Sequence, residues 1–362
     1  MTLNRPWTER TIERTIERTL ARAAGSPGPR RAASLTALSA AALALAAVAG
    51  AVAATVASVA VAQDFPARPV RLVIGFPPGG PADFFARTLS DPLSRQWGQP
   101  VLVDNRAGAN GLIAAEFVLR SQADGHALYL SSAGALVIQQ HLQLKMPFET
   151  LVDFTPVSHV VSVPELLVAH PALPATNVKE LVALARKRPG QITFASTSTG
   201  GMPHLAGEQF KAAAGIDIIH VPFKGAAPAV IDLVAGHVQI LFADLPILLP
   251  QVKGGKLRPL VLASNRRHPL LADVPTTAEA GMPGVLADNW YGVVVPVKTP
   301  AVVVARLNQS LVKVLQEPAV RTRLSDQGAE ATGGTPEQFA EFIRAETARW
   351  GRVVKAAGLK AE

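Results

Sequence analysis

Cysteine is absent from this chain of 362 residues, which excludes disulfide bonds, thiolate metal sites and a cysteine nucleophile. The eight histidines are scattered, with no HxH or HxxxH pair of the kind that holds zinc. Aromatic residues make up only 5% of the chain, and no basic stripe interleaved with aromatic residues indicates contact with a nucleic acid. The sequence therefore predicts no metal, no cofactor and no nucleic-acid partner.

Charged residues are few as well, at 17% of the chain. Half of the net charge of +8 lies in the first 62 residues, which contain seven arginines and three glutamates. Arg30 and Arg31 precede an uncharged run, residues 32–61, and a small-x-small site, Ala60-Val61-Ala62, ends it. This is the pattern of a secretory signal that is cleaved before Gln63. We expect export to the periplasm by the Sec route. The Tat route and an uncleaved membrane anchor are the alternatives.

Beyond residue 63 the chain alternates short β-rich runs with helical segments, and its length suits two domains. Strands separated by helices predict an α/β fold, with parallel sheets that carry helices on their faces. Asn177 is placed to cap one helix, and Thr335, Pro336 and Gln338 form the capping-box pattern of the last helix. Pro92 lies inside the first predicted helix and should kink or divide it.

The domain organisation follows from this alternation. We expect residues 1–62 to form the N-terminal extension and signal, residues 63–164 and 290–362 to form one lobe, and residues 165–289 to form the other. Each lobe should contain a mainly parallel sheet flanked by helices. Two extended segments then cross between the lobes and would act as a hinge.

The segment GFPPGGPAD, residues 75–83, is a candidate binding loop, because it follows a strand and begins a helix. Ligands of open α/β sheets bind beyond the carboxyl ends of the strands, where a helix N-terminus offers free N–H groups and partial positive charge to an anion. Gly79 and Gly80 let a ligand approach the backbone, and Pro77 and Pro78 stiffen the turn. A strand-to-helix turn without a ligand is the alternative, and neither a Walker loop nor GxGxxG is present.

Further segments follow strands in the same way. Residues 196–201, STSTGG, and residues 130–135, LSSAGA, offer small hydroxyl groups and bare backbone at helix starts. Lys224 and Gly225 also stand between a strand and a helix, where the lysine either complements an anion or is a solvated surface residue. Asp244 ends a strand, and we favour capping of the next helix over contact with a ligand amine or hydroxyl.

Ser196 or Ser198, together with His204 and Asp244, supplies the residue types of a hydrolase triad. We do not favour this interpretation, because no GxSxG elbow is present and nothing in the sequence fixes a base beside either serine. His204 is expected instead to pack or hydrogen-bond near the cleft, at the start of its helix. We therefore predict that the protein is not an enzyme.

Several longer segments resemble the substrate-binding proteins of tripartite tricarboxylate transporters, the Bug family. They are FPARPVRLVIGFPPGGPAD, QPVLVDNRAGANG, HLAGEQFKAAAGIDIIHVPFKGAAPAVIDLVAGHVQI, DVPTTAEAGMPG and the terminal TPEQFAEFIRAE, in the order typical of the family. The resemblance runs from about residue 65 to residue 359. It implies a two-lobed periplasmic binding fold of the Venus-flytrap kind, type II-like, that captures a small carboxylate between its lobes and delivers it to a membrane permease.

The resemblance also implies which residues contact the ligand, position by position. The family often has Ser-Thr where this chain has Pro81-Ala82, which removes two hydroxyls and one backbone N–H from the expected anion site. We expect a monomer, and a sensor that presents a bound carboxylate to a receptor is the alternative function. The predicted contacts are Phe76, Pro77, Gly79, Gly80, Ala82, Asp83, Ser131, Ser132, Ser196, Thr197, Ser198, Thr199, Gly200, His204, Lys224, Gly225 and Asp244.

Overall fold

The computed structural model describes residues 65–142 and 145–359 of the chain. The predicted secretory signal, its cleavage site and the alternative membrane anchor lie outside the described residues. Within those two ranges, no helix is both long enough and apolar enough to cross a membrane.

Lobe 1 is built on a mixed sheet with the strand order β2-β1-β3-β9-β4, to which β10 adds beside β4. β1 pairs in parallel with β2 and β3, whereas β9 is antiparallel to β3 and β4. We expected a mainly parallel sheet, and the difference arises because the long strands β4 and β9 both pass through it. The strands of lobe 1 besides β4 are β1 Val70–Ile74, β2 Val101–Asn105, β3 Ala127–Ser132, β9 Asp288–Pro296 and β10 Glu330–Gly333.

Lobe 2 repeats this arrangement on a smaller sheet with the order β4-β7-β5-β6. β5 is parallel to β6 and β7, and both β7 and β8 pair with β4 in antiparallel fashion. Its strands besides β4 are β5 Thr193–Ser196, β6 Ile219–Pro222, β7 Ile240–Asp244 and β8 Arg258–Leu262.

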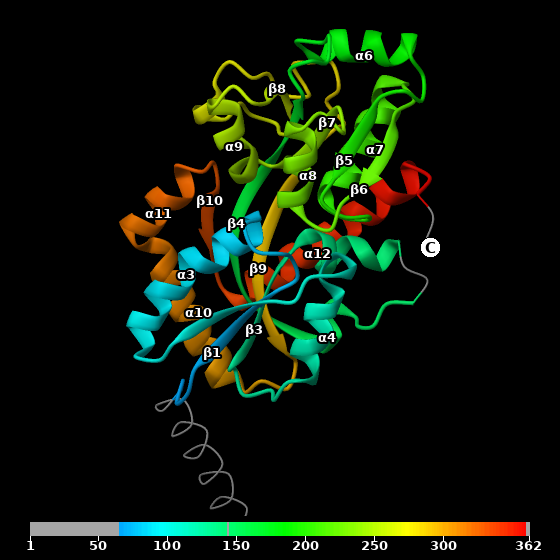
Figure 1. Cartoon of the computed structure of the whole chain (residues 1–362). Coiled ribbons are helices and arrows are strands. Elements are labelled where there is room, and N and C mark those ends of the chain that lie inside the picture. Colours follow the sequence, from blue (N-terminus) through cyan, green and yellow to red (C-terminus); the bar gives the residue numbers. More distant parts are fainter. Residues whose placement is uncertain (1–64, 143–144, 360–362) are drawn as a thin grey trace, which may run out of the picture. The chain divides into compact units, whose positions relative to one another are not determined.

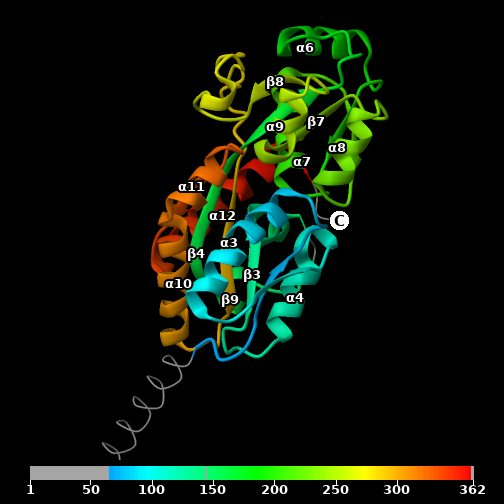
Figure 2. The same ribbon diagram turned by 60° about the vertical axis from the view of Figure 1, so that its left-hand side comes forward.

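The strand β4, Phe154–Ala169, belongs to both sheets. It pairs with β9 as far as Pro164, with β7 from Glu165 onward and with β8 from Leu166 onward. Figures 1 and 2 both show β4 and β9 running side by side where the two lobes meet. The lobe boundaries after residues 164 and 289 stay a prediction.

Helices α6 to α9 surround the sheet of lobe 2, and α3, α4, α10, α11 and α12 lie around the sheet of lobe 1 (Figure 1). The α-helices are α3 Pro81–Trp97, α4 Leu112–Arg120, α5 Thr150–Asp153, α6 Val178–Lys187, α7 Met202–Ala214, α8 Ala226–Val234, α9 Leu245–Lys253, α10 Ala301–Gln316, α11 Pro318–Ser325 and α12 Pro336–Ala356. The short 3-10 helices are η1 Ala109–Gly111, η3 Gln139–His141 and η4 Pro269–Leu271, and η2 Gly134–Ile138 is a π-helix.

Both faces of the lobe 1 sheet are covered, as the alternation along β1 requires. Leu72 and Ile74 point into one buried cluster with Phe85 of α3, whereas Val73 points into the other with Val118 of α4. Because α3 packs along the sheet in this way, its N-terminus lies at the carboxyl edge of β1.

The predicted helix caps are confirmed. Asn177 accepts a hydrogen bond from the Glu180 N–H, and the capping box at Thr335 is complete. Pro92, however, does not divide α3, which is one helix. A proline inside a helix costs about 3 kcal/mol of stability. Leu89 and Leu93 beside the proline are fully buried, and the burial of each side chain stabilises the fold by about 1.5–3 kcal/mol, which offsets that cost.

Candidate functional site

A small chamber lies between the two lobes, and the N-termini of three helices form much of its wall. Its volume is about 30 Å³, which is room for a carboxylate-sized group or one or two water molecules. We call it the inner chamber. It is lined by Phe76, Pro77, Gly80, Pro81, Ala82, Asn110, Ser132, Thr197, Ser198, Gly201, Met202, Pro203, Ala226, Ala227, Asp244, Asn289 and Tyr291.

Each of the three helices begins after a glycine. Gly80 precedes α3, Gly201 precedes α7 and Gly225 precedes α8, and no side chain caps any of these N-termini. Gly225 has φ 118°, a conformation that glycine adopts readily. First-turn N–H groups without a side-chain cap, together with the positive ends of three helix dipoles, suit a small anion.

The proline at position 81 changes the α3 N-terminus as expected from the sequence. Pro81 is the first residue of α3 and has no N–H to offer. Ala82 follows it on the chamber wall and is buried. This helix therefore offers an anion one backbone donor fewer than a helix with serine at the first position.

Asp244 lines the inner chamber, and the prediction that its side chain caps the next helix is wrong. It occupies the N-cap position of α9 without making a side-chain cap. Instead, its carboxylate accepts hydrogen bonds from Asn289 Nδ2 at 2.8 Å and from the Tyr291 hydroxyl at 2.6 Å. These two donors come from β9, so Asp244 ties the end of β7 in lobe 2 to a strand of lobe 1.

A second carboxyl group lies against Asp244. Glu165 is its register partner on β4, is completely buried, and accepts no hydrogen bond from a donor of the described residues. Burial, followed by the charge of Asp244, raises the pKa of Glu165 well above its usual value. Glu165 is therefore the protonated member of the pair.

An outer cavity of about 830 Å³ also lies between the lobes. Among the described residues that line it, Lys224 is the only Lys, Arg, Asp or Glu. His204 and His220 line it as a stacked pair with ring centroids 4.0 Å apart. Burial lowers the pKa of His204 to about 4 and, together with the charges of His204 and Lys211, that of His220 to about 3, so both rings are neutral at pH 7. The cavity suits the uncharged body of a ligand.

A histidine does lie beside a serine, contrary to the expectation that no base would be placed there. Ser196 Oγ is 2.7 Å from His220 Nε2. The serine is completely buried and outside both sets of lining residues. His204 accepts a hydrogen bond from the Gly200 N–H, and Asp244 is bonded to β9, so the triad considered from the sequence is not assembled.

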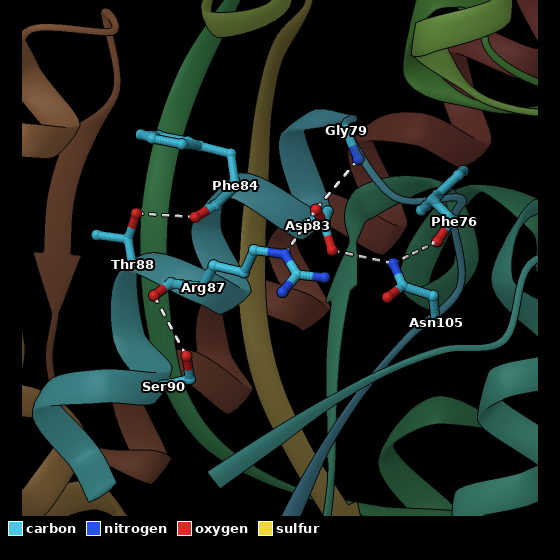
Figure 3. A network of polar contacts seen from close by, with 8 residues as sticks. All are labelled: Phe76, Gly79, Asp83, Phe84, Arg87, Thr88, Ser90 and Asn105. Carbon is cyan, nitrogen blue, oxygen red and sulfur yellow. Dashed lines mark hydrogen bonds and ion pairs between the residues drawn. The ribbon is translucent and has the colours of Figure 1, made fainter. Parts of the chain in front are cut away.

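Asp83 holds the first candidate binding loop, residues 75–83, in place (Figure 3). Its carboxylate accepts hydrogen bonds from the Gly79 N–H at 3.1 Å, Arg87 Nε at 2.9 Å and Asn105 Nδ2 at 3.1 Å, and Asn105 also donates to the Phe76 carbonyl. Burial alone would raise the pKa of Asp83, but these hydrogen bonds and the Arg87 charge lower it below its usual value. Both ends of the turn at residues 76–79 are thereby held to α3 and β2.

The structure brings most of the predicted contacts together around the two cavities. Gly79, Asp83, Ser131 and Ser196 lie outside both linings. Sequence reasoning missed several lining residues, although Asn110 and His220 both lay in segments that carried the family resemblance. The missed residues that contribute polar side chains are Asn110, Gln139, His220, Asn289 and Tyr291.

Two lobes that share the strand β4, with a chamber between them, define the class of periplasmic solute-binding proteins. Residues 85–359 match the family model of the tripartite tricarboxylate transporter family receptor, so the chain belongs to this family. This confirms the resemblance to the Bug proteins.

Individual relatives agree with this assignment. The chain is 39% identical to protein BugT of Bordetella pertussis over 300 residues, which is 83% of this chain and 92% of the relative. It is similar to the structure of Rpa4515 of R. palustris with adipate, at 36% identity and a TM-score of 0.81, over 83% of this chain and all of the other. It is also similar to MatC of Rhodopseudomonas palustris with bound malate, at 32% identity and a TM-score of 0.77, over 80% of this chain and all of the other.

Proposed function

We propose that this protein is an exported receptor that binds a small organic acid in the inner chamber and delivers it to a membrane permease. The observation that carries the proposal is the convergence of the α3, α7 and α8 N-termini on a chamber lined by both lobes. The acid carboxylate lies against these N-termini, and the rest of the molecule extends into the outer cavity.

Membership of the family and the acids named for two structural relatives, adipate and malate, support a carboxylate ligand. Delivery to a permease and export by the signal before Gln63 are part of the same proposal. Closure of the lobes follows if the acid binds the closed form better than the open form.

A thermal-shift panel tests ligand binding. The protein is unfolded and refolded to remove ligand carried over from the host, and is then heated with di- and tricarboxylates, aromatic acids and acidic amino acids. A ligand at one hundred times its Kd stabilises the protein by about 2.7 kcal/mol. If no acid of the panel raises the Tm, the proposal fails.

Gly80→Val tests the location of the site. A Cβ at Gly80 would lie 3.8 Å from the Pro77 carbonyl and 4.0 Å from Ala226 Cβ, so the backbone accepts a side chain while the methyl groups of valine fill the chamber. We expect binding to fall at least a hundredfold with the fold intact. Gly284→Val, at an exposed glycine with open space around it, is the matched control. Unchanged affinity in folded Gly80→Val would place the acid elsewhere.

A further inference from the structure

Asn110 makes two hydrogen bonds that connect the lobes. It belongs to the turn η1 of lobe 1, and its Nδ2 donates to the Gly200 carbonyl of lobe 2 at 3.2 Å. Its Oδ1 accepts a hydrogen bond from Ser198 Oγ at 2.7 Å. One amide therefore engages both a backbone and a side-chain group of the loop between β5 and α7, and both bonds are buried.

The surroundings of Asn110 hold its side chain in place. Its backbone is left-handed, with φ 51° and ψ 34°, a conformation that asparagine tolerates better than most residues. Gly134 lies so close that a Cβ there would be 2.8 Å from Asn110 Nδ2. Gln139 of lobe 1 makes a parallel bridge, since its Nε2 donates to the Thr199 carbonyl at 3.0 Å. Three consecutive residues of the lobe 2 loop are thus bonded to lobe 1.

Asn110 also stands where the two cavities share their lining. The residues common to both linings are Phe76, Pro77, Asn110, Thr197 and Ser198. Phe76, Pro77 and Asn110 come from lobe 1, and Thr197 and Ser198 come from lobe 2. The hydrogen bond between Asn110 and Ser198 therefore joins the two lobes at the place where the inner chamber and the outer cavity adjoin.

We propose that Asn110 is a latch between the lobes. Its side-chain amide holds the lobes closed through its hydrogen bonds with Ser198 and Gly200, and these bonds must break before a ligand can leave. The role in ligand release rests on the proposed function. The role in holding the lobes together does not, because both bonds join protein groups alone.

Spin-label distance measurements on the protein without ligand test the latch. The chain has no cysteine, so Leu102→Cys on β2 of lobe 1 and Ile231→Cys on α8 of lobe 2 introduce two unique labelling sites, which are 52% and 67% exposed. Asn110→Gly removes the side-chain amide, and glycine adopts the positive φ of this position without strain. The loss of two buried hydrogen bonds should shift the closed-to-open ratio by about tenfold to a hundredfold. We expect a longer interlobe distance to gain population.

Two further variants make the result specific. Ala109→Gly, at the preceding residue and also at positive φ (46°), is the matched control and should keep the parent distribution. Gly134→Ala should displace the Asn110 amide, because the added Cβ would lie 2.8 Å from Nδ2, and should reproduce the Asn110→Gly distribution. If folded Asn110→Gly and the parent give superimposable distributions, the latch is refuted. If the latch variants open but no carboxylate binds the parent, the proposed function fails and the latch stands.

Discussion

Replacement of Glu165 by glutamine tests whether a proton is buried between the lobes. Glu165 and Asp244 face each other across β4 and β7, both are buried, and burial raises the pKa of Glu165 well above its usual value. A glutamine amide keeps the shape of the protonated acid and places no charge beside Asp244. We therefore expect Glu165→Gln to fold normally.

The pH dependence of the unfolding free energy gives the size of the difference expected between Glu165→Gln and the parent. An acid whose pKa is raised by folding contributes stability that is complete below its unfolded pKa, about 4.3, and is lost as pH rises toward its folded pKa. Each pH unit in this window costs the parent up to about 1.4 kcal/mol through Glu165, a cost that Glu165→Gln does not have. Between about pH 5.5 and pH 7.5 the variant should therefore gain up to about 2.7 kcal/mol over the parent.

Urea unfolding at these two pH values measures the difference. Glu341→Gln, which removes an exposed carboxylate paired with Arg344, is the control for the loss of a carboxylate as such. An equal free-energy difference between Glu165→Gln and the parent at both pH values would show that Glu165 is ionised in the folded protein, and would refute the assignment of the proton.

Other predictions follow from single contacts. Pro81→Ala restores one N–H at the start of α3 and should tighten carboxylate binding up to about tenfold, as measured by calorimetry against the parent. Asp83→Asn should destabilise the protein by about 1–3 kcal/mol at pH 7, because the Gly79 N–H loses its charged acceptor. The pKa of Asp83 is below its usual 3.8, so this difference in unfolding free energy should shrink as pH falls below about 4; a constant difference would contradict the bracing role. Ser196→Ala breaks the contact with His220, and both parent and variant should hydrolyse an activated ester no faster than an unrelated protein. Ester hydrolysis by the parent that Ser196→Ala abolishes would instead support the hydrolase interpretation.

Much of the site could be predicted because its elements are local. A glycine before a helix, a proline in the first turn and a hydroxyl-rich loop after a strand are each encoded within a few residues. Parallel strands then bring such loops to one edge of a sheet without further information. For this reason Gly80, Thr197 and Ser198 were expected at the site, and all three line the inner chamber.

The residues that were missed or misassigned depend on distant parts of the chain. Asp244 bonds to residues 45 and 47 positions away, and Asn110 bonds to a serine 88 positions away. A strand-end aspartate followed by a helix looks like a cap in sequence, and only the pairing of β7 with β4 and the neighbouring β9 gives its carboxylate other partners.

Local sequence patterns were sufficient to predict the α/β class, the helix caps at Asn177 and Thr335, the glycine residues before the helices and the family of the protein. These features depend on backbone preferences and residue periodicity, which act between near neighbours. The tertiary structure alone decided that Glu165 meets Asp244, that His220 meets Ser196 and that Asn110 joins the lobes. Such contacts follow from strand register and lobe closure, which place residues together that no local pattern connects.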